Sequence, residues 1–298
     1  MSFVSAAVLF ALSTAVLLSL RNISIRIGLT KSDAIVGVFL SALIAIPISV
    51  AATLVQGDFF IVVNYNVFNV ALLGAAGVIH YVLGRIFIFN SIKLIGASRA
   101  TTILQAYVVV AALLSMAFLG ELIELETGVG IALIIPGLMI MSGSGPTGEK
   151  TSTDRRIFRR GFHYAILAIL CWALSPVFVR AAVIDLGSPL VGNVIANIFG
   201  LVAVIGYMIP SRGFEKIKKT DRRSMKILLL ASILGSLSQL SQYMALGLGN
   251  VAIVTPLTST HILITMIISY LFLQHLEKIN PKVVLAGALV IVGLYLII

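Results

Sequence analysis

Charged residues are scarce in this sequence. They make up 11% of its 298 residues, whereas a soluble domain carries about 25%. Hydrophobic residues make up 59%, so the chain has too few polar side chains to cover a surface that faces water. The single cysteine, Cys171, excludes an intrachain disulfide and a cysteine-based metal cluster. These shortages exclude an ordinary soluble fold and indicate a polytopic membrane protein.

Acidic residues are missing from the interiors of the apolar segments. All 11 Asp and Glu fall in connections or at segment ends. Exporters that exchange protons for cationic drugs need a carboxylate inside the membrane, so that mechanism is not expected here. The sequence also has no metal-ligand spacing, nucleophile elbow, phosphate-binding loop or paired carboxylates. We therefore expect no enzymatic activity, no metal and no cofactor.

Long apolar runs are what the sequence has in abundance. An α-helix needs about 17–25 mainly apolar residues to cross a hydrocarbon core of about 30 Å. The fold class that follows is an all-α polytopic membrane protein with ten transmembrane helices. The expected spans are residues 3–25, 34–55, 67–89, 97–119, 127–141, 164–184, 190–209, 225–246, 251–273 and 281–298.

The least hydrophobic stretch divides the chain almost in half. Residues 142–160 contain Gly, Ser, Thr, Pro and seven charged residues, a composition typical of a solvated linker. The chain is therefore expected to comprise a first repeat (1–141), the linker (142–160) and a second repeat (161–298). Five spans on each side require the repeats to be inverted in the membrane. Matching residues recur in order, as Arg21 and Arg180, Leu94 and Leu248, and Glu121 and Glu277.

The basic residues lie almost entirely on one side of the predicted membrane. Of 21 Lys and Arg, 19 fall in or beside the linker and the connections after spans 1, 3, 7 and 9; the exceptions are Arg85 and Arg180. Basic connections stay in the cytoplasm. The charge distribution predicts a multi-pass plasma-membrane protein with a cytoplasmic linker and both termini outside. It argues against a nucleic-acid partner, which the net charge of +10 taken alone would suggest.

Several short segments resemble the drug/metabolite transporter superfamily, in particular its ten-span EamA-like members. They are residues 95–100 and 249–254 at the starts of spans 4 and 9, 119–121 at the end of span 4, and the small-residue patterns 130–137 and 286–293. The resemblance implies a transporter with a cavity lined by spans 1, 3, 4, 6, 8 and 9. It also implies that both termini lie in the cytoplasm. The charge distribution predicts the opposite, and we adopt the orientation that the charges predict.

Polar side chains inside the spans are the candidate site residues, because such groups are costly at membrane depth unless they face protein or a water-filled cavity. Two histidines, His80 and His261, are candidates for coupling transport to protons. Each residue also has a structural interpretation, such as hydrogen bonding between helices or snorkelling of Arg85. The candidate substrate-binding residues are Thr14, His80, Tyr81, Arg85, Gln105, Tyr107, Trp172, Ser175, Gln239, Gln242, Tyr243, Thr258 and His261.

An interior with His, Arg and Gln but no carboxylate favours substrates that carry a carboxylate or other hydrogen-bond acceptors. The function predicted is secondary active transport of a small polar metabolite, an amino acid or a related organic acid or amide, by alternating access, with export as the expected direction. The alternatives are export of amphipathic drugs and a flippase or facilitative channel for a small or lipid-linked metabolite. The expected partners are the substrate and the lipid bilayer, with the chain acting as a monomer or homodimer.

Overall fold

The structure, a computed structural model, describes most of the chain. The described residues are 3–28, 31–58, 60, 66–95, 103–104, 106–143, 154–184, 188–261, 264, 285, 288–289, 292–293 and 296. Over these residues the secondary structure is helical, with turns and short links between helices. The expected all-α class is therefore confirmed.

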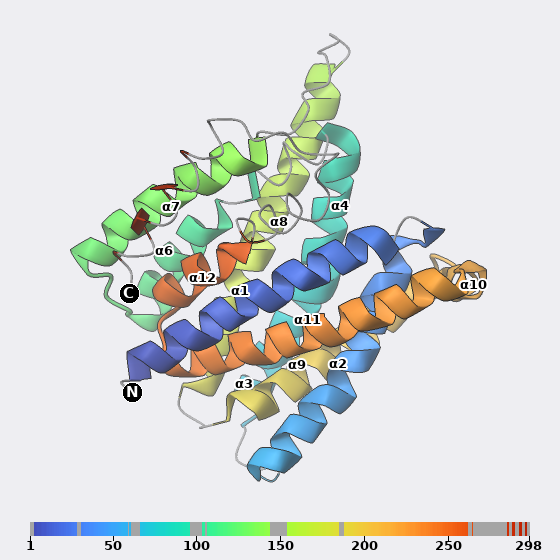
Figure 1. Cartoon of the computed structure of the whole chain (residues 1–298), viewed down its shortest axis with the longest axis horizontal. Helices are drawn as coiled ribbons and strands as arrows, with labels where there is room; N and C mark the ends of the chain where they lie inside the picture. Colours follow the sequence, from blue (N-terminus) through green and yellow to red (C-terminus); the bar gives the residue numbers. More distant parts are fainter. Residues whose placement is uncertain are drawn as a thin grey trace. The chain divides into compact units, whose positions relative to one another are not determined.

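Twelve elements follow one another in the described chain (Figure 1). Six helical segments are long and apolar enough to cross a membrane, and they coincide with expected spans 1, 2, 3, 6, 7 and 8. The ten-helix count stays a prediction, because about half of span 251–273 and most of span 281–298 lie outside the described residues. The elements are α1 (Phe3–Gly28), α2 (Ala34–Gln56), α3 (Val67–Val78), the π-helical turn η3 (Ile79–Leu83), α4 (Gly84–Ile95), α6 (Tyr107–Leu119), α7 (Leu125–Gly143), α8 (Asp154–Val183), α9 (Pro189–Met208), α10 (Gly213–Lys219), α11 (Arg222–Leu248) and α12 (Val251–Ser259).

Helix bounds differ from the expected spans where polar residues continue a helix. Because α3, η3 and α4 follow without a break, the third helical segment runs to Ile95 rather than residue 89. The last seven residues of the expected linker are helical, since α8 begins at Asp154. The helix α6 begins at Tyr107; earlier in expected span 4, residues 103–104 are helical and residues 97–102 and 105 lie outside the described residues.

Side-chain caps fix several helix ends. The Asp33 carboxylate accepts a hydrogen bond from the Ile35 amide at 3.0 Å, and Ser188 precedes a proline at the start of α9. Gly57 ends α2 with φ of 79°, a left-handed conformation that glycine adopts without strain. Asp221 caps α11, and the Ser224 side chain, followed by the Ser224 and Arg223 amides, holds the pKa of Asp221 below its ordinary value.

The chain forms two compact units, and each draws helices from both halves of the sequence. The first unit comprises residues 1–82 and 178–249, and the second comprises residues 83–177 and 250–298. The chain passes from one unit to the other within η3, after Val177 in α8, which follows Pro176, and after Gly249 at the end of α11. A π-helical turn and a proline both interrupt regular helical hydrogen bonding.

In the first unit, α1 and α11 lie side by side along their lengths (Figure 1). They are antiparallel, because the hydroxyl of Ser241 donates to the carbonyl of Phe10 at 2.8 Å and that of Ser238 donates to Thr14 at 3.0 Å. Near the other end of α1, Gly28 lies against Leu228. Small residues and side-chain hydrogen bonds hold helices together in membranes, where lipid removes the hydrophobic driving force between them.

The contact between α3 and α9 brings two backbones into van der Waals contact. A Cβ atom on Gly77 would collide with the carbonyl oxygen of Ala196, and one on Gly74 would lie 2.9 Å from the ring of Phe199. On α9, Gly200 leaves room for the ring of Tyr81. The glycines therefore determine how closely these helices approach.

The basic stretch between α9 and α11 forms a short helix, α10, which packs on α2. Phe214 meets Phe39 edge-on with ring centroids 6.1 Å apart, and Lys216 pairs with Asp33 at 2.9 Å. The hydroxyls of Ser32 and Thr220 lie 2.9 Å apart. Both members of the ion pair are partly exposed, so the apolar contact contributes more to the position of α10 than the charges do.

In the second unit, α4 and α8 share an apolar core of Ile88, Ala168 and Ile169, to which Leu104 also contributes. The helix α12 packs against α6 and α7. Gly293, one of the described residues near the end of the chain, lies against the carbonyl oxygen of Gly130 and against Ile134. Small residues therefore permit close contact in this unit too.

Replacing Gly77 with Ala is expected to lower the melting temperature of the purified protein, because the added methyl group forces α3 and α9 apart. Overpacking of this kind costs about 1–3 kcal/mol. The control is Gly206→Ala on α9, where an added Cβ meets nothing within 4 Å and the helix gains from losing a glycine. Equal melting temperatures for the two variants would contradict the role given to Gly77.

Candidate functional site

The expected site residues divide between the two units, and Gln105 lies outside the described residues. The cavity expected to unite them stays a prediction, so each group is described within its own unit. The first unit holds Thr14, His80, Tyr81, Gln239, Gln242 and Tyr243, and the second holds Arg85, Tyr107, Trp172, Ser175, Thr258 and His261.

Thr14 is part of the packing between α1 and α11. Its side chain is buried, and its hydroxyl donates to the carbonyl oxygen of Phe10 at 2.8 Å. Its own carbonyl accepts the hydrogen bond from Ser238. The side-chain hydroxyl and the carbonyl of Thr14 therefore both bond within this helix pair, and its role in substrate binding stays a prediction.

Tyr81 belongs to a buried polar network in the first unit. Its hydroxyl donates to the Asn197 side-chain oxygen at 2.8 Å, and the Asn197 amide donates to Asn193 at 2.9 Å and to Ser49 at 3.2 Å. Ser49 in turn donates to Asn193. The network links η3, α9 and α2. The sequence interpretation missed it, because the two asparagines lie in a span whose other residues are mostly apolar.

His80 occupies the π-helical turn beside Tyr81. Its ring is half-buried and meets the ring of Tyr81 edge-on, with centroids 5.4 Å apart. Arg85, five residues later, is also half-buried and lies in α4. Both make further contacts within the protein. A π-helical turn alters the regular hydrogen bonding of its helix and often marks a functional position.

Gln239 and Gln242 differ from the other polar residues of the first unit. They lie three residues apart on α11, so their side chains leave the same face of the helix. Both are half-buried, and neither amide forms a hydrogen bond with a described residue. The adjacent Tyr243 is buried. Each amide therefore retains two donors and an acceptor for water or a ligand.

The second unit gathers aromatic and hydroxyl groups around the start of α6. The hydroxyls of Tyr107 and Ser259 share a hydrogen bond of 2.5 Å, and the ring of Tyr107 meets Trp172 edge-on at 6.0 Å. In α12 and the turn after it, the Thr258 hydroxyl donates to Thr255 at 2.9 Å and the His261 ring bonds the Thr258 carbonyl at 3.0 Å. The structure thus brings together three expected residues, Tyr107, Trp172 and Thr258, with Ser259, which the sequence interpretation missed.

Two buried charged residues act on helix ends. In the first unit, the Arg180 guanidinium donates to the carbonyls of Leu246 and Gly247 at 2.8 and 3.1 Å, at the carboxyl end of α11. In the second unit, the Glu121 carboxylate accepts a hydrogen bond from the Val251 amide at 3.0 Å, at the amino end of α12. Each charge complements the helix dipole at the end it contacts. These contacts give both residues a structural role.

Comparison with protein families yields a match over nearly all of the chain. The family model described as the EamA-like transporter family matches twice, at residues 5–143 and 159–298. The chain belongs to the EamA-like transporter family. The resemblance inferred from short segments is therefore confirmed, and the two matches fall on either side of the central linker.

The family identifies this EamA-like protein as a membrane transporter of the drug/metabolite type, and its members are transporters rather than enzymes. A solved structure titled "Crystal structure of protein" is similar to it, with a TM-score of 0.76 at 14% identity. That likeness covers 98% of this chain and 96% of the other, and it shows the fold alone. No curated protein sequence matches this EamA-like chain.

Proposed function

We propose that this EamA-like protein is a secondary active transporter that exports a small polar metabolite by alternating access. The substrate class is an amino acid or a related organic acid or amide. Acidic residues of the described chain lie at helix ends or in connections, so the apolar interiors offer donors and neutral amides rather than carboxylates. Such an interior suits a substrate that brings its own carboxylate or amide.

The observation that carries this proposal is the pair of half-buried amides, Gln239 and Gln242. A polar group at membrane depth that has no protein partner requires water or a ligand, since hydrocarbon offers no hydrogen bonds. An amide presents both donors and an acceptor, and it therefore matches the carboxylate and ammonium groups of an amino acid. Tyr107 and Ser259 in the second unit supply hydroxyls of the same neutral character.

The proposed mechanism relies on two inverted five-helix repeats, and helix packing in the first unit supports it. There α2 packs against α11, while α9 packs against α3. If α2 and α9 are equivalent helices of the two repeats, as are α3 and α11, these two contacts are equivalent as well. A two-fold relation between the repeats produces such paired contacts, in which a helix of each repeat packs against the corresponding helix of the other.

Replacing Gln239 and Gln242 together by Leu is expected to raise KM for the transported amino acid or organic acid at least tenfold in proteoliposomes. The loss follows from removing two hydrogen-bonding groups that face the substrate. The melting temperature should stay level or rise, because neither glutamine side chain has a hydrogen bond to a described residue that the substitution would break. Gln56→Leu, at the exposed end of α2, is the control and should transport like the native protein. Lowered melting with unchanged KM would show instead that the amides hold helices together.

His80 and His261 are the groups we propose for proton coupling, because histidine ordinarily changes charge near pH 6.5, about the range over which cells operate. A glutamine at either position keeps hydrogen-bonding capacity but does not titrate. In vesicles with an imposed proton gradient, the native protein is expected to accumulate substrate, and His80→Gln or His261→Gln to equilibrate it only. Gradient-driven accumulation by both variants would remove the histidines from the mechanism.

The orientation we propose follows from charge, with α10 and the linker in the cytoplasm and both termini outside. Cys171 is buried and is the only cysteine, so a Cys171→Ala background permits single-cysteine labelling. In intact cells, an impermeant maleimide is expected to label Gln56→Cys and to leave Lys218→Cys unlabelled until the membrane is opened. The reverse pattern would invert the orientation.

A further inference from the structure

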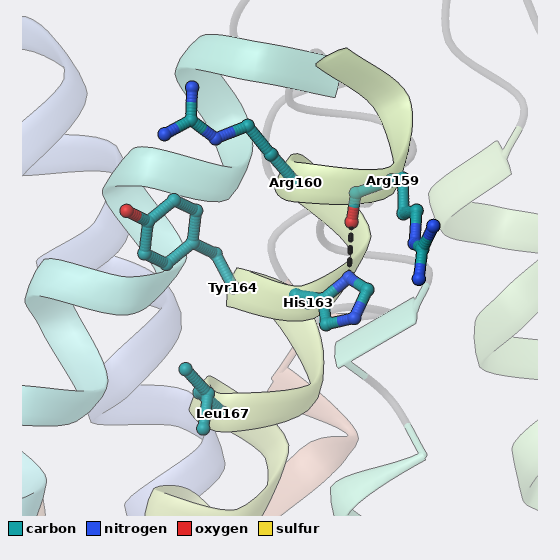
Figure 2. A pocket seen from close by; sticks show the side chains of 5 residues that line it. All are labelled: Arg159, Arg160, His163, Tyr164 and Leu167. Carbon is teal, nitrogen blue, oxygen red and sulfur yellow. Dashed lines mark hydrogen bonds between the residues drawn. The ribbon is translucent and has the colours of Figure 1, made fainter. Parts of the chain in front are cut away.

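A hollow of about 430 Å³ lies against the first turns of α8 (Figure 2). The described residues that line it are Arg159, Arg160, His163, Tyr164 and Leu167, all from this helix. Arg160, Tyr164 and Leu167 leave one side of the helix, as their spacing of four and three residues requires, while Arg159 leaves another. None of these residues belongs to the groups assigned to substrate or to proton coupling.

The rim of the hollow is basic over the residues that the structure describes. Both guanidinium groups belong to exposed residues, and no described residue forms an ion pair with either. The His163 Nδ1 atom donates to the carbonyl oxygen of Arg159 at 2.6 Å, which fixes the imidazole ring beside the two arginines. Arginine binds phosphate through pairs of parallel hydrogen bonds, so Arg160, on the same side of α8 as Tyr164 and Leu167, is suited to bind a phosphate group, and Arg159 adds positive charge on the neighbouring side.

The floor of the hollow is rigid and apolar. Tyr164 stacks on Phe87 of α4 in the same unit, with ring centroids 6.3 Å apart and an interplanar angle of 27°. Leu167 lies one turn further along α8, on the same side. A ligand whose phosphate contacts Arg160 therefore meets an aromatic ring and then a leucine, rather than further polar groups.

The position of the hollow along α8 matches the boundary between lipid headgroups and acyl chains. The candidate membrane span of α8 starts at Arg159. Deeper in the span, Phe162, Ile166, Leu167 and Leu170 are each 38–43% exposed and form an apolar surface. With a rise of 1.5 Å per residue, Leu170 lies about 15 Å from Arg160, within reach of an acyl chain whose headgroup contacts the arginines.

We propose that this hollow binds an anionic phospholipid, with its phosphate held by Arg160, positive charge added by Arg159 on the neighbouring side of α8, and an acyl chain lying along Leu167 and Leu170. Basic residues beside an apolar helix face recognise anionic lipid of the cytoplasmic leaflet. A free phosphate ester satisfies the arginines alone and leaves the apolar surface uncovered. The lipid therefore accounts for both parts of the hollow.

The test uses the purified full-length chain, stripped of lipid in detergent, and measures binding of phosphatidylglycerol by native mass spectrometry. Phosphatidylcholine is the zwitterionic comparison, and glycerol phosphate is the probe for a headgroup without acyl chains. The native protein is expected to bind phosphatidylglycerol in preference to both. Equal binding of phosphatidylcholine, or binding of glycerol phosphate as tight as that of the lipid, would overturn the proposal.

Replacing both arginines, as Arg159→Gln with Arg160→Gln, is expected to weaken phosphatidylglycerol binding about tenfold or more, because each basic residue near an anionic surface contributes roughly fivefold. The matched control is Arg222→Gln with Arg223→Gln, which removes the same charge from exposed positions at the start of α11. The control should weaken binding less than twofold. Equal weakening in the two double variants would reduce the effect to general surface charge.

Two further substitutions separate the parts of the site. Arg160→Lys keeps the charge but removes the paired hydrogen bonds, so it is expected to weaken lipid binding severalfold with the fold unchanged. Leu167→Gln should weaken binding of the lipid but not of glycerol phosphate. If Leu167→Gln leaves lipid binding at the native level, the acyl chain does not lie along α8 and the proposal fails.

Discussion

The physical constraint on which this structure depends is that hydrocarbon supplies neither hydrogen bonds nor a hydrophobic drive between helices. Because the chain is helical, its backbone groups form their hydrogen bonds within each helix. Because a hydrophobic drive between helices is missing, close contact between backbones holds the helices together instead. Gly77 against the Ala196 carbonyl and the two serine hydroxyls of α11 on carbonyls of α1 are the clearest examples. Positions that look unremarkable in composition, glycines and serines, therefore determine how the helices of each unit associate.

The same constraint explains what buried charge does here. Arg180 and Glu121 are each only 9% exposed, and each contacts the helix end whose dipole it complements. In sequence these ends are separated by Gly249 and Asn250 alone, so one short link is held by a cation on one side and an anion on the other. Charge that is consumed in this way is not available to substrate. The groups we propose for selectivity toward an anionic or zwitterionic substrate are therefore neutral amides, hydroxyls, the two membrane histidines and Arg85.

Hydropathy averaged over about twenty residues predicts the membrane spans well. It predicts poorly the features that depend on single residues, such as polar helices beside the membrane and buried polar contacts. The spans of α1, α2, α9 and α11 begin and end within a few residues of expectation, because their apolar runs have sharp polar boundaries. The early start of α8 and the short helix α10 escaped prediction, since polar helices beside a membrane read as loops. The polar contacts of Asn193 and Asn197 were also missed, because the apolar neighbours of these residues in α9 raise the average hydropathy of the span. Tyr81, which bonds Asn197, was expected to face the substrate. Its hydrogen bond joins residues 116 positions apart in the sequence, so sequence patterns do not reveal it.

The hydrogen-bonding state of each polar residue narrows the candidate site in a way that sequence could not. Hydroxyls in a helix can bond a carbonyl of the preceding turn, as Thr14 and Thr258 do, and so settle at membrane depth without any partner helix. A glutamine side chain carries more hydrogen-bonding groups than one backbone carbonyl can satisfy. Half-buried glutamines without a described partner are therefore stronger indicators of a polar ligand than threonines or serines at the same level. By this criterion α11, which supplies Gln239 and Gln242, is the helix of the first unit that we propose for substrate recognition.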